Sequence, residues 1–80
     1  MDKTERELRY QIEKWTKLLE KKLEKITSSK DPEFLKNIKA YYSDSKHFFE
    51  EKDFIRSFEA LLWSYSWLEI GIRYSFLEEK

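Results

Sequence analysis

Apolar side chains recur through the first third of the chain at steps of three and four residues. They fall at Leu8, Ile12, Trp15, Leu19, Leu23 and Ile26. Because these steps place side chains on one face of an α-helix, they predict an amphipathic helix over about residues 4–27. Thr4 and Glu7 have the spacing of a capping box, so we expect this helix to begin at the threonine.

A second helical pattern follows a short polar connection at residues 27–30. Asp31 and Pro32 predict its start, because aspartate caps the first turn of a helix and proline is tolerated within that turn. Its apolar face consists of Phe34, Leu35, Ile38, Tyr41, Tyr42, Phe48 and Phe49. This face predicts a helix over about residues 32–51, and we expect Lys52 to end it in the position where glycine is commonest.

The last third of the chain has the richest apolar pattern and predicts a third helix over about residues 54–78, capped by Asp53. Its core-facing stripe consists of Phe54, Phe58, Leu61, Tyr65, Leu68, Ile72 and Phe76. An adjacent helix-packing stripe has only small side chains, at Ser57, Ala60, Ser64, Gly71 and Ser75. Small side chains let a neighbouring helix approach closely, which explains a glycine in the middle of a helix.

Beyond these two stripes lie five further apolar residues, Trp63, Trp67, Ile70, Tyr74 and Leu77. We call the first four the aromatic face and take them as the candidate partner-binding residues. They widen the apolar arc of the third helix to about twice the roughly 100° that a helix in a three-helix bundle needs. Tryptophan and tyrosine are enriched at protein interfaces. The aromatic face is therefore either a partner-binding surface or internal core, and the sequence leaves both interpretations open.

Three amphipathic helices with short connections predict one all-α domain over residues 1–80. The expected architecture is a three-helix up-and-down bundle with antiparallel neighbours and a left-handed twist, as a monomer or a homodimer. A chain this short buries only about 60% of the surface that its unfolded form exposes. The sequence has no cysteine for a disulfide, so close helix packing and self-association are the stabilising devices left.

The distribution of charged and apolar residues argues against several function classes. The 16 basic and 16 acidic side chains balance, which argues against a general binder of nucleic acid or of anionic membranes. No apolar run reaches the roughly 18–20 residues of a membrane span, and the charged N-terminus is unlike a signal segment, so we expect a soluble cytoplasmic protein. The alternative, an RNA- or nucleotide-associated role, depends on a basic ridge of the first helix at Lys14, Lys17, Lys21 and Lys25. Neighbouring carboxylates at Glu13, Glu20 and Glu24 oppose phosphate binding there.

Residues with catalytic or metal-binding potential are sparse. The sequence has no P-loop, no Gly-rich dinucleotide turn and no Cys/His metal set. His47 is the only histidine, and we expect it on a polar face without an orienting partner. Glu69 and Arg73 are four residues apart, which predicts an ion pair along the third helix. We expect neither an enzyme nor a cofactor or metal, with an enzyme completed by a second chain as a further alternative.

The second half of the chain also carries a spaced motif. Its positions are Tyr41, Asp44 and Phe48, then the turn Glu51, Lys52 and Asp53, then Trp67, Leu68, Glu69, Gly71 and Arg73. In these positions the sequence resembles the archaeal family catalogued as domain of unknown function 357. It differs from that family's pattern at Lys52, where glycine is usual, at Tyr65, where histidine is frequent, and at Glu69, where aspartate is.

The resemblance implies a small up-and-down helical bundle with no assigned activity. The missing histidine at Tyr65 argues against a catalytic role shared with relatives that have it. Taken with the residue pattern, this favours a non-enzymatic module for protein interaction or self-association that uses the aromatic face. Its partner is then a protein, either a second copy of the chain or a different one.

Overall fold

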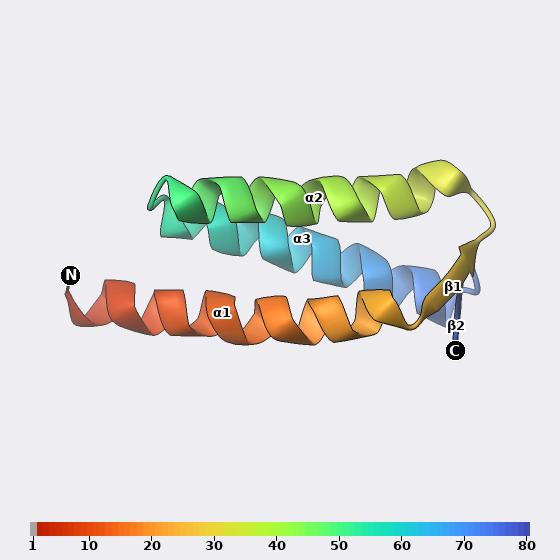
Figure 1. Cartoon of the computed structure of the whole chain (residues 1–80), viewed down its shortest axis with the longest axis horizontal. Coiled ribbons are helices and arrows are strands. Elements are labelled where there is room, and N and C mark those ends of the chain that lie inside the picture. The colour runs from red at the N-terminus through yellow and green to blue at the C-terminus, as the bar shows by residue number, and fades with distance from the viewer. Residues whose placement is uncertain (1) are drawn as a thin grey trace.

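The computed structural model describes residues 2–80, and three helices make up most of them. The elements are α1 (Lys3–Glu24), β1 (Ile26–Ser29), α2 (Pro32–Glu50), α3 (Phe54–Arg73) and β2 (Leu77–Glu79). Helices α1 and α3 run in one direction and α2 runs back between them in the chain (Figure 1). The predicted all-α, three-helix up-and-down bundle is thereby confirmed, with a small two-stranded sheet added at one end.

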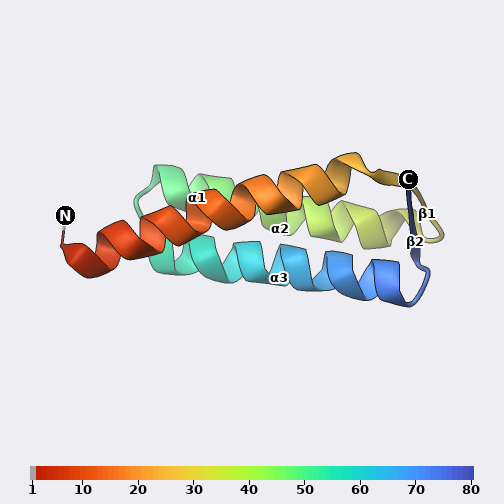
Figure 2. The same cartoon turned by 90° about the horizontal axis from the view of Figure 1, so that it is seen from below.

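Helices α2 and α3 form a close hairpin, and α1 packs mainly against α3. Figure 2 shows α1 crossing the hairpin obliquely, with its first turns reaching beyond the α2–α3 turn. The molecule is accordingly elongated, with extents of 43 × 19 × 17 Å. None of the helices within residues 2–80 is long and apolar enough to cross a membrane.

The close α2–α3 contact depends on small side chains. Ser57, Ala60, Ser64 and Gly71 of the helix-packing stripe are all buried. The buried serine hydroxyls form hydrogen bonds within the protein in place of those to water. The Ser64 hydroxyl donates to the carbonyl of Ile38 at 2.7 Å, and the Ser57 hydroxyl donates to a carbonyl of α2 at 2.8 Å. Because buried polar groups are costly unless they are paired, these bonds fix the register of the two helices.

The helix starts depend on three aspartates. Asp31 and Asp53 cap α2 and α3 as predicted, each accepting a hydrogen bond from a backbone amide two or three residues onward, at 3.0 and 3.2 Å. The predicted capping box at Thr4 is wrong. Asp2 caps α1 instead, accepting from the amide of Glu5 at 2.8 Å, because its side chain already satisfies one of the first free amides.

Helices α2 and α3 both end in a Schellman motif, each with a residue other than glycine in the left-handed position. Lys52 has a φ of 63° and Ser75 a φ of 62°. The next amide in each case reaches back to the last turn: Asp53 donates to the Phe48 carbonyl at 2.9 Å, and the amide after Ser75 makes the equivalent bond at 2.8 Å. The third helix therefore ends at Arg73, and its predicted extension to residue 78 is wrong.

A Lys52→Gly variant is expected to be more stable than the parent chain. Left-handed backbone costs a residue with a side chain about 1–2 kcal/mol of stability, and glycine avoids this cost. Glycine is also more flexible in the unfolded chain, which offsets about 0.5–1 kcal/mol of the gain. Urea unfolding should show a net gain of about 0.5–1 kcal/mol. Lys36→Gly, at an exposed position inside α2, is the matched control and should lose about 1 kcal/mol. Equal or lower stability of Lys52→Gly would contradict this account of the turn.

Strand β1 lies where the sequence predicted the end of the first helix and the polar connection after it. Strand β2 lies where the sequence predicted the end of the third helix. They pair antiparallel, with Ile26 opposite Glu79 and Ser29 opposite Leu77. Two further backbone hydrogen bonds extend the ribbon. The amide of Lys30 donates to the carbonyl of the residue just before β2 at 2.8 Å, and the amide of Lys80 donates to the carbonyl of the residue just before β1 at 2.7 Å. The ribbon holds Leu77 buried against the end of the core.

Candidate functional site

The four residues of the aromatic face lie on the surface of α3. Their exposed fractions are 56% for Trp63, 37% for Trp67, 40% for Ile70 and 63% for Tyr74. The core is made by other side chains, namely Ile12, Leu19, Ile38, Phe54, Leu61, Leu68 and Leu77. The structure therefore places the aromatic face outside the core, so the interpretation as internal core is wrong, and the partner-binding surface stays a prediction.

Two rings from α2 hold the indole rings of the aromatic face in place. Trp63 is stacked on Tyr41, with ring centroids 6.4 Å apart and planes 23° apart. Trp67 meets Phe34 edge to face at 5.8 Å. Paired aromatic rings favour such offset or edge arrangements, and each pair adds about 0.5–1.5 kcal/mol beyond its buried area. The two indoles are thus exposed on one side and fixed on the other, as anchor residues of interfaces commonly are.

Helix α3 also exposes two apolar residues that the sequence did not assign to a site, Ile55 and Leu62. They lie seven residues apart, which is two helical turns, and this spacing was the signal that could have found them. Phe76 was predicted to face the core, and this is wrong. It lies after the end of α3, is 44% exposed and stacks on Phe34 at 5.4 Å. Ser75, predicted as part of the helix-packing stripe, is likewise exposed in the turn.

Helix α1 covers a different flank of α3. Trp15 meets Tyr65 edge to face at 5.3 Å, and the ammonium group of Lys22 donates to a carboxylate oxygen of Glu69 at 2.5 Å. The hydrogen bond to Glu69 raises the pKa of Lys22 above its ordinary value, because it stabilises the charged amine. Glu69 therefore pairs with α1, whereas the sequence predicted a pair between Glu69 and Arg73.

A groove of about 320 Å³ runs between α1 and α2, where these helices have few direct contacts. On its rim the Tyr42 hydroxyl donates to the carboxylate of Glu20, and the ammonium of Lys46 donates to the Tyr42 oxygen at 3.3 Å. Burial raises the pKa of Tyr42, and the hydrogen bond to Glu20 raises it further, because both disfavour the phenolate. The contact is thus a neutral phenol that joins a carboxylate of one helix to an amine of another.

Alkaline pH is expected to destabilise the chain in part through Tyr42. Its pKa is higher in the folded chain than the ordinary 10.0, so its contribution to stability is complete below pH 10 and is lost as pH rises through the folded value. Between about pH 9 and pH 11 the parent chain should lose more free energy of unfolding than a Tyr42→Phe variant. Urea unfolding at both pH values measures the difference. Equal losses would show that Tyr42 does not carry this linkage.

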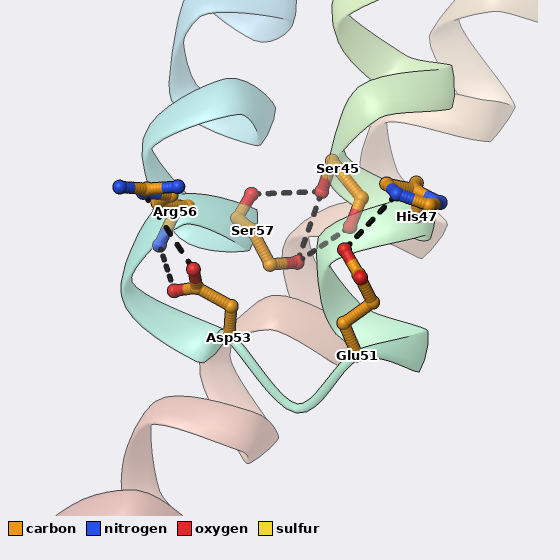
Figure 3. Close-up of polar contacts among 6 residues, drawn as sticks. All are labelled: Ser45, His47, Glu51, Asp53, Arg56 and Ser57. Carbon is orange, nitrogen blue, oxygen red and sulfur yellow. Dashed lines mark hydrogen bonds and ion pairs between the residues drawn. The ribbon is translucent and has the colours of Figure 1, made fainter.

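Three separate polar pairs lie around the α2–α3 turn, namely His47–Glu51, Ser45–Ser57 and Asp53–Arg56, and Figure 3 shows them together. His47 lies 3.0 Å from Glu51, so the expectation that it has no orienting partner is wrong, although both side chains are exposed. Ser45 and Ser57 exchange their own hydrogen bonds at 2.8 Å across the hairpin. Within the described residues, the serines thus bond to each other and not to His47, and the geometry of a Ser–His pair is not formed here (Figure 3).

The basic ridge of α1 lies exposed in solvent. Lys14, Lys17 and Lys21 border one shallow hollow of about 370 Å³, which also includes Glu13. That glutamate accepts from Arg9 at 3.3 Å, so the ridge lies directly beside paired charges of both signs. The RNA- or nucleotide-associated alternative stays a prediction. Among residues 2–80 no group of three or more His, Cys, Asp or Glu side chains is arranged to hold a metal ion.

Comparison with known proteins agrees with the fold and with the spaced motif of the second half. The family described as "Protein of unknown function (DUF357)" matches residues 14–77. A crystal structure of a DUF357 protein from Archaeoglobus fulgidus superposes with a TM-score of 0.88 and is 40% identical, over 96% of this chain and 99% of that chain. No match was found among curated proteins. The chain therefore belongs to DUF357, an archaeal family of proteins of unknown function.

Proposed function

We propose that this DUF357 chain is a non-enzymatic interaction module that binds a protein partner through the aromatic face. The observation that carries the proposal is the half-exposed indole of Trp63, fixed from behind by Tyr41. A rigid aromatic side chain loses little conformational entropy when a partner covers it. Such side chains supply most of the binding energy in measured interfaces. The partner is either a second copy of the chain or another protein.

The position of the aromatic face supports this function. Leu61 and Leu68 of α3 are fully buried in the core, and α1 and α2 both pack against α3. The aromatic face is therefore not needed to close the core. Exposed apolar patches on small proteins are commonly interaction sites. The reason is that binding is favoured by about 25 cal/mol for each Å² of apolar surface that a partner buries.

A charged double variant, Trp63→Lys with Tyr74→Lys, tests the proposal. These two rings are the most exposed of the aromatic face, so lysine can replace them without opening the core. Tyr10→Lys on α1 is the matched control, because Tyr10 is also more than half exposed but lies on another helix. Light scattering and retention of proteins on the immobilised chain are measured, with circular dichroism as the check on folding.

We expect the double variant to fold, to lose self-association and to lose any retained partner, while Tyr10→Lys keeps both. Two results would overturn the proposal. One is a double variant whose mass and retained proteins equal those of the parent chain. The other is a parent chain that neither associates with itself nor retains any protein.

A further inference from the structure

The outward side of α3 carries a stripe that is symmetric in sequence. Its five exposed residues, which we call the outer stripe, are Glu59, Leu62, Ser66, Ile70 and Arg73. The steps between them are three, four, four and three, so they lie on one face of the helix and are centred on the serine. The centre is small, the next positions on both sides are branched aliphatic residues, and the two ends have opposite charge.

Neither of the other helices covers the outer stripe. Helix α2 meets α3 at buried residues such as Ser57 and Ser64, and α1 meets it at Tyr65 and Glu69. Figure 2 shows α3 along one edge of the bundle, with one long side free of both neighbours. All five residues of the outer stripe are exposed, so the outer stripe lies on the part of α3 that its neighbours leave open. It adjoins the aromatic face and shares Ile70 with it.

The charges at the ends of the outer stripe are available to a partner. Glu69, the sequence neighbour that could neutralise Arg73, is paired with Lys22. Over residues 2–80, no ion pair engages either Glu59 or Arg73, and the guanidinium group of Arg73 only lies over the ring of Tyr74 at 5.9 Å. Fourteen residues separate Glu59 from Arg73, which is about 21 Å along a helix, so the two cannot pair within one chain.

We infer that a second copy of this chain packs its α3 antiparallel against the outer stripe, about a two-fold axis at Ser66. Glu59 of each copy then lies opposite Arg73 of the other, and this charge pair occurs twice. Leu62 packs against Ile70 of the second copy on both sides of the axis. The small serine at the centre lets the two backbones approach, as small residues do in close helix pairs. The interface is isologous, because one patch binds itself.

The charge pattern selects this orientation over a parallel one. In a parallel pair Glu59 would face its own copy, and so would Arg73, so that both contacts would repel. The inference rests on the proposed function and names the partner of the aromatic face as a second copy of the chain. The antiparallel pair brings Trp63 of one copy beside Ile70 of the other, so the aromatic face takes part in the contact. A standard interface uses about 800 Å² from each partner, roughly one eighth of the 5948 Å² that this chain exposes.

Reversing the charges one at a time tests the inference. Glu59→Arg alone and Arg73→Glu alone each convert both attractive pairs of the dimer into repulsive ones. An exposed ion pair changes the dimer Kd by up to about fivefold, and the dimer contains this pair twice. Each single variant should therefore raise the dimer Kd about tenfold or more. Mixing the two variants in equal amounts should restore the dimer, because each repels itself and attracts the other. The Glu59→Arg/Arg73→Glu double variant should also restore it.

Lys39→Glu, an exposed charge reversal on α2, is the control and should leave the dimer unchanged. The measurement is sedimentation equilibrium. Only the antiparallel arrangement predicts that each single variant weakens the dimer and that the double variant restores it, because a parallel pair would repel at both positions in the parent chain, in each single variant and in the double variant. A dimer that neither charge variant weakens would overturn the inference, even if Trp63→Lys/Tyr74→Lys abolishes association and the proposed function stands. A parent chain that stays monomeric would overturn it too. The proposed function would then depend on whether the aromatic face retains a different protein.

Discussion

Replacing Leu19 by alanine is expected to remove much of the stability of the bundle. Leu19 is fully buried, with 0% of its surface exposed, and belongs to the stripe through which α1 meets the α2–α3 hairpin. Truncating a buried leucine to alanine costs about 2–5 kcal/mol, from lost burial and from the cavity that remains. A domain of this size has a total of only about 4–12 kcal/mol. Thermal unfolding should show a midpoint lower by about 10 °C or more.

The neighbouring residue supplies a matched control. Leu18 is the same residue type in the same helix, but 39% of its surface is exposed. Leu18→Ala should therefore cost less than about 1 kcal/mol, because little buried area is lost. Similar losses for the two variants would mean that α1 does not dock through Leu19, and the described packing of the first helix would be wrong.

Replacing Gly71 by valine is expected to open the end of the bundle that carries the β-ribbon. A Cβ atom at this position would lie 2.6 Å from a ring carbon of Phe34 and 2.7 and 2.8 Å from the Cδ1 and Cγ atoms of Leu77. These contacts are too short, so both side chains must move. Overpacking of this kind costs about 1–3 kcal/mol, and valine has little helix propensity to offset it.

The damage should be local before it is global. Leu77 is held by the β1–β2 pairing, so its displacement should free the backbone amide of Lys30, which donates into the C-terminal segment at 2.8 Å. Amide hydrogen exchange should therefore be faster at Lys30 in Gly71→Val than in the parent chain. Ser43→Val, at an exposed position of α2, is the control. Unchanged exchange and stability in Gly71→Val would contradict the close approach of Phe34 and Leu77 to the glycine.

The sequence predicted the helices because their signals are local. The apolar steps through Ile12 and Leu19 define the buried side of α1, and Asp31 and Asp53 mark the starts of α2 and α3 directly. The β-ribbon was missed for the opposite reason. Its two strands are about fifty residues apart in the chain, and Ile26 also fits the helical period of the residues before it. Nothing local indicates that this segment pairs with the C-terminus.

The end of the third helix was missed because its signal is weak. Serine is not a usual residue for left-handed backbone, yet Ser75 adopts that conformation and turns the chain away from the helix axis. The aromatic face was found from its excess width, but its exposure depends on where α1 docks. That docking uses Trp15 and Lys22, whose partners on α3 are set by tertiary packing rather than by spacing.

The outward side of α3, the aromatic face and the outer stripe together, is expected to be an association surface between copies of this chain. Light scattering of the parent chain over at least about a hundredfold range of concentration measures its solution mass and decides this point. We expect the mass to rise with concentration from the 10.0 kDa of one chain toward twice that value. A mass that stays at 10.0 kDa throughout would contradict it.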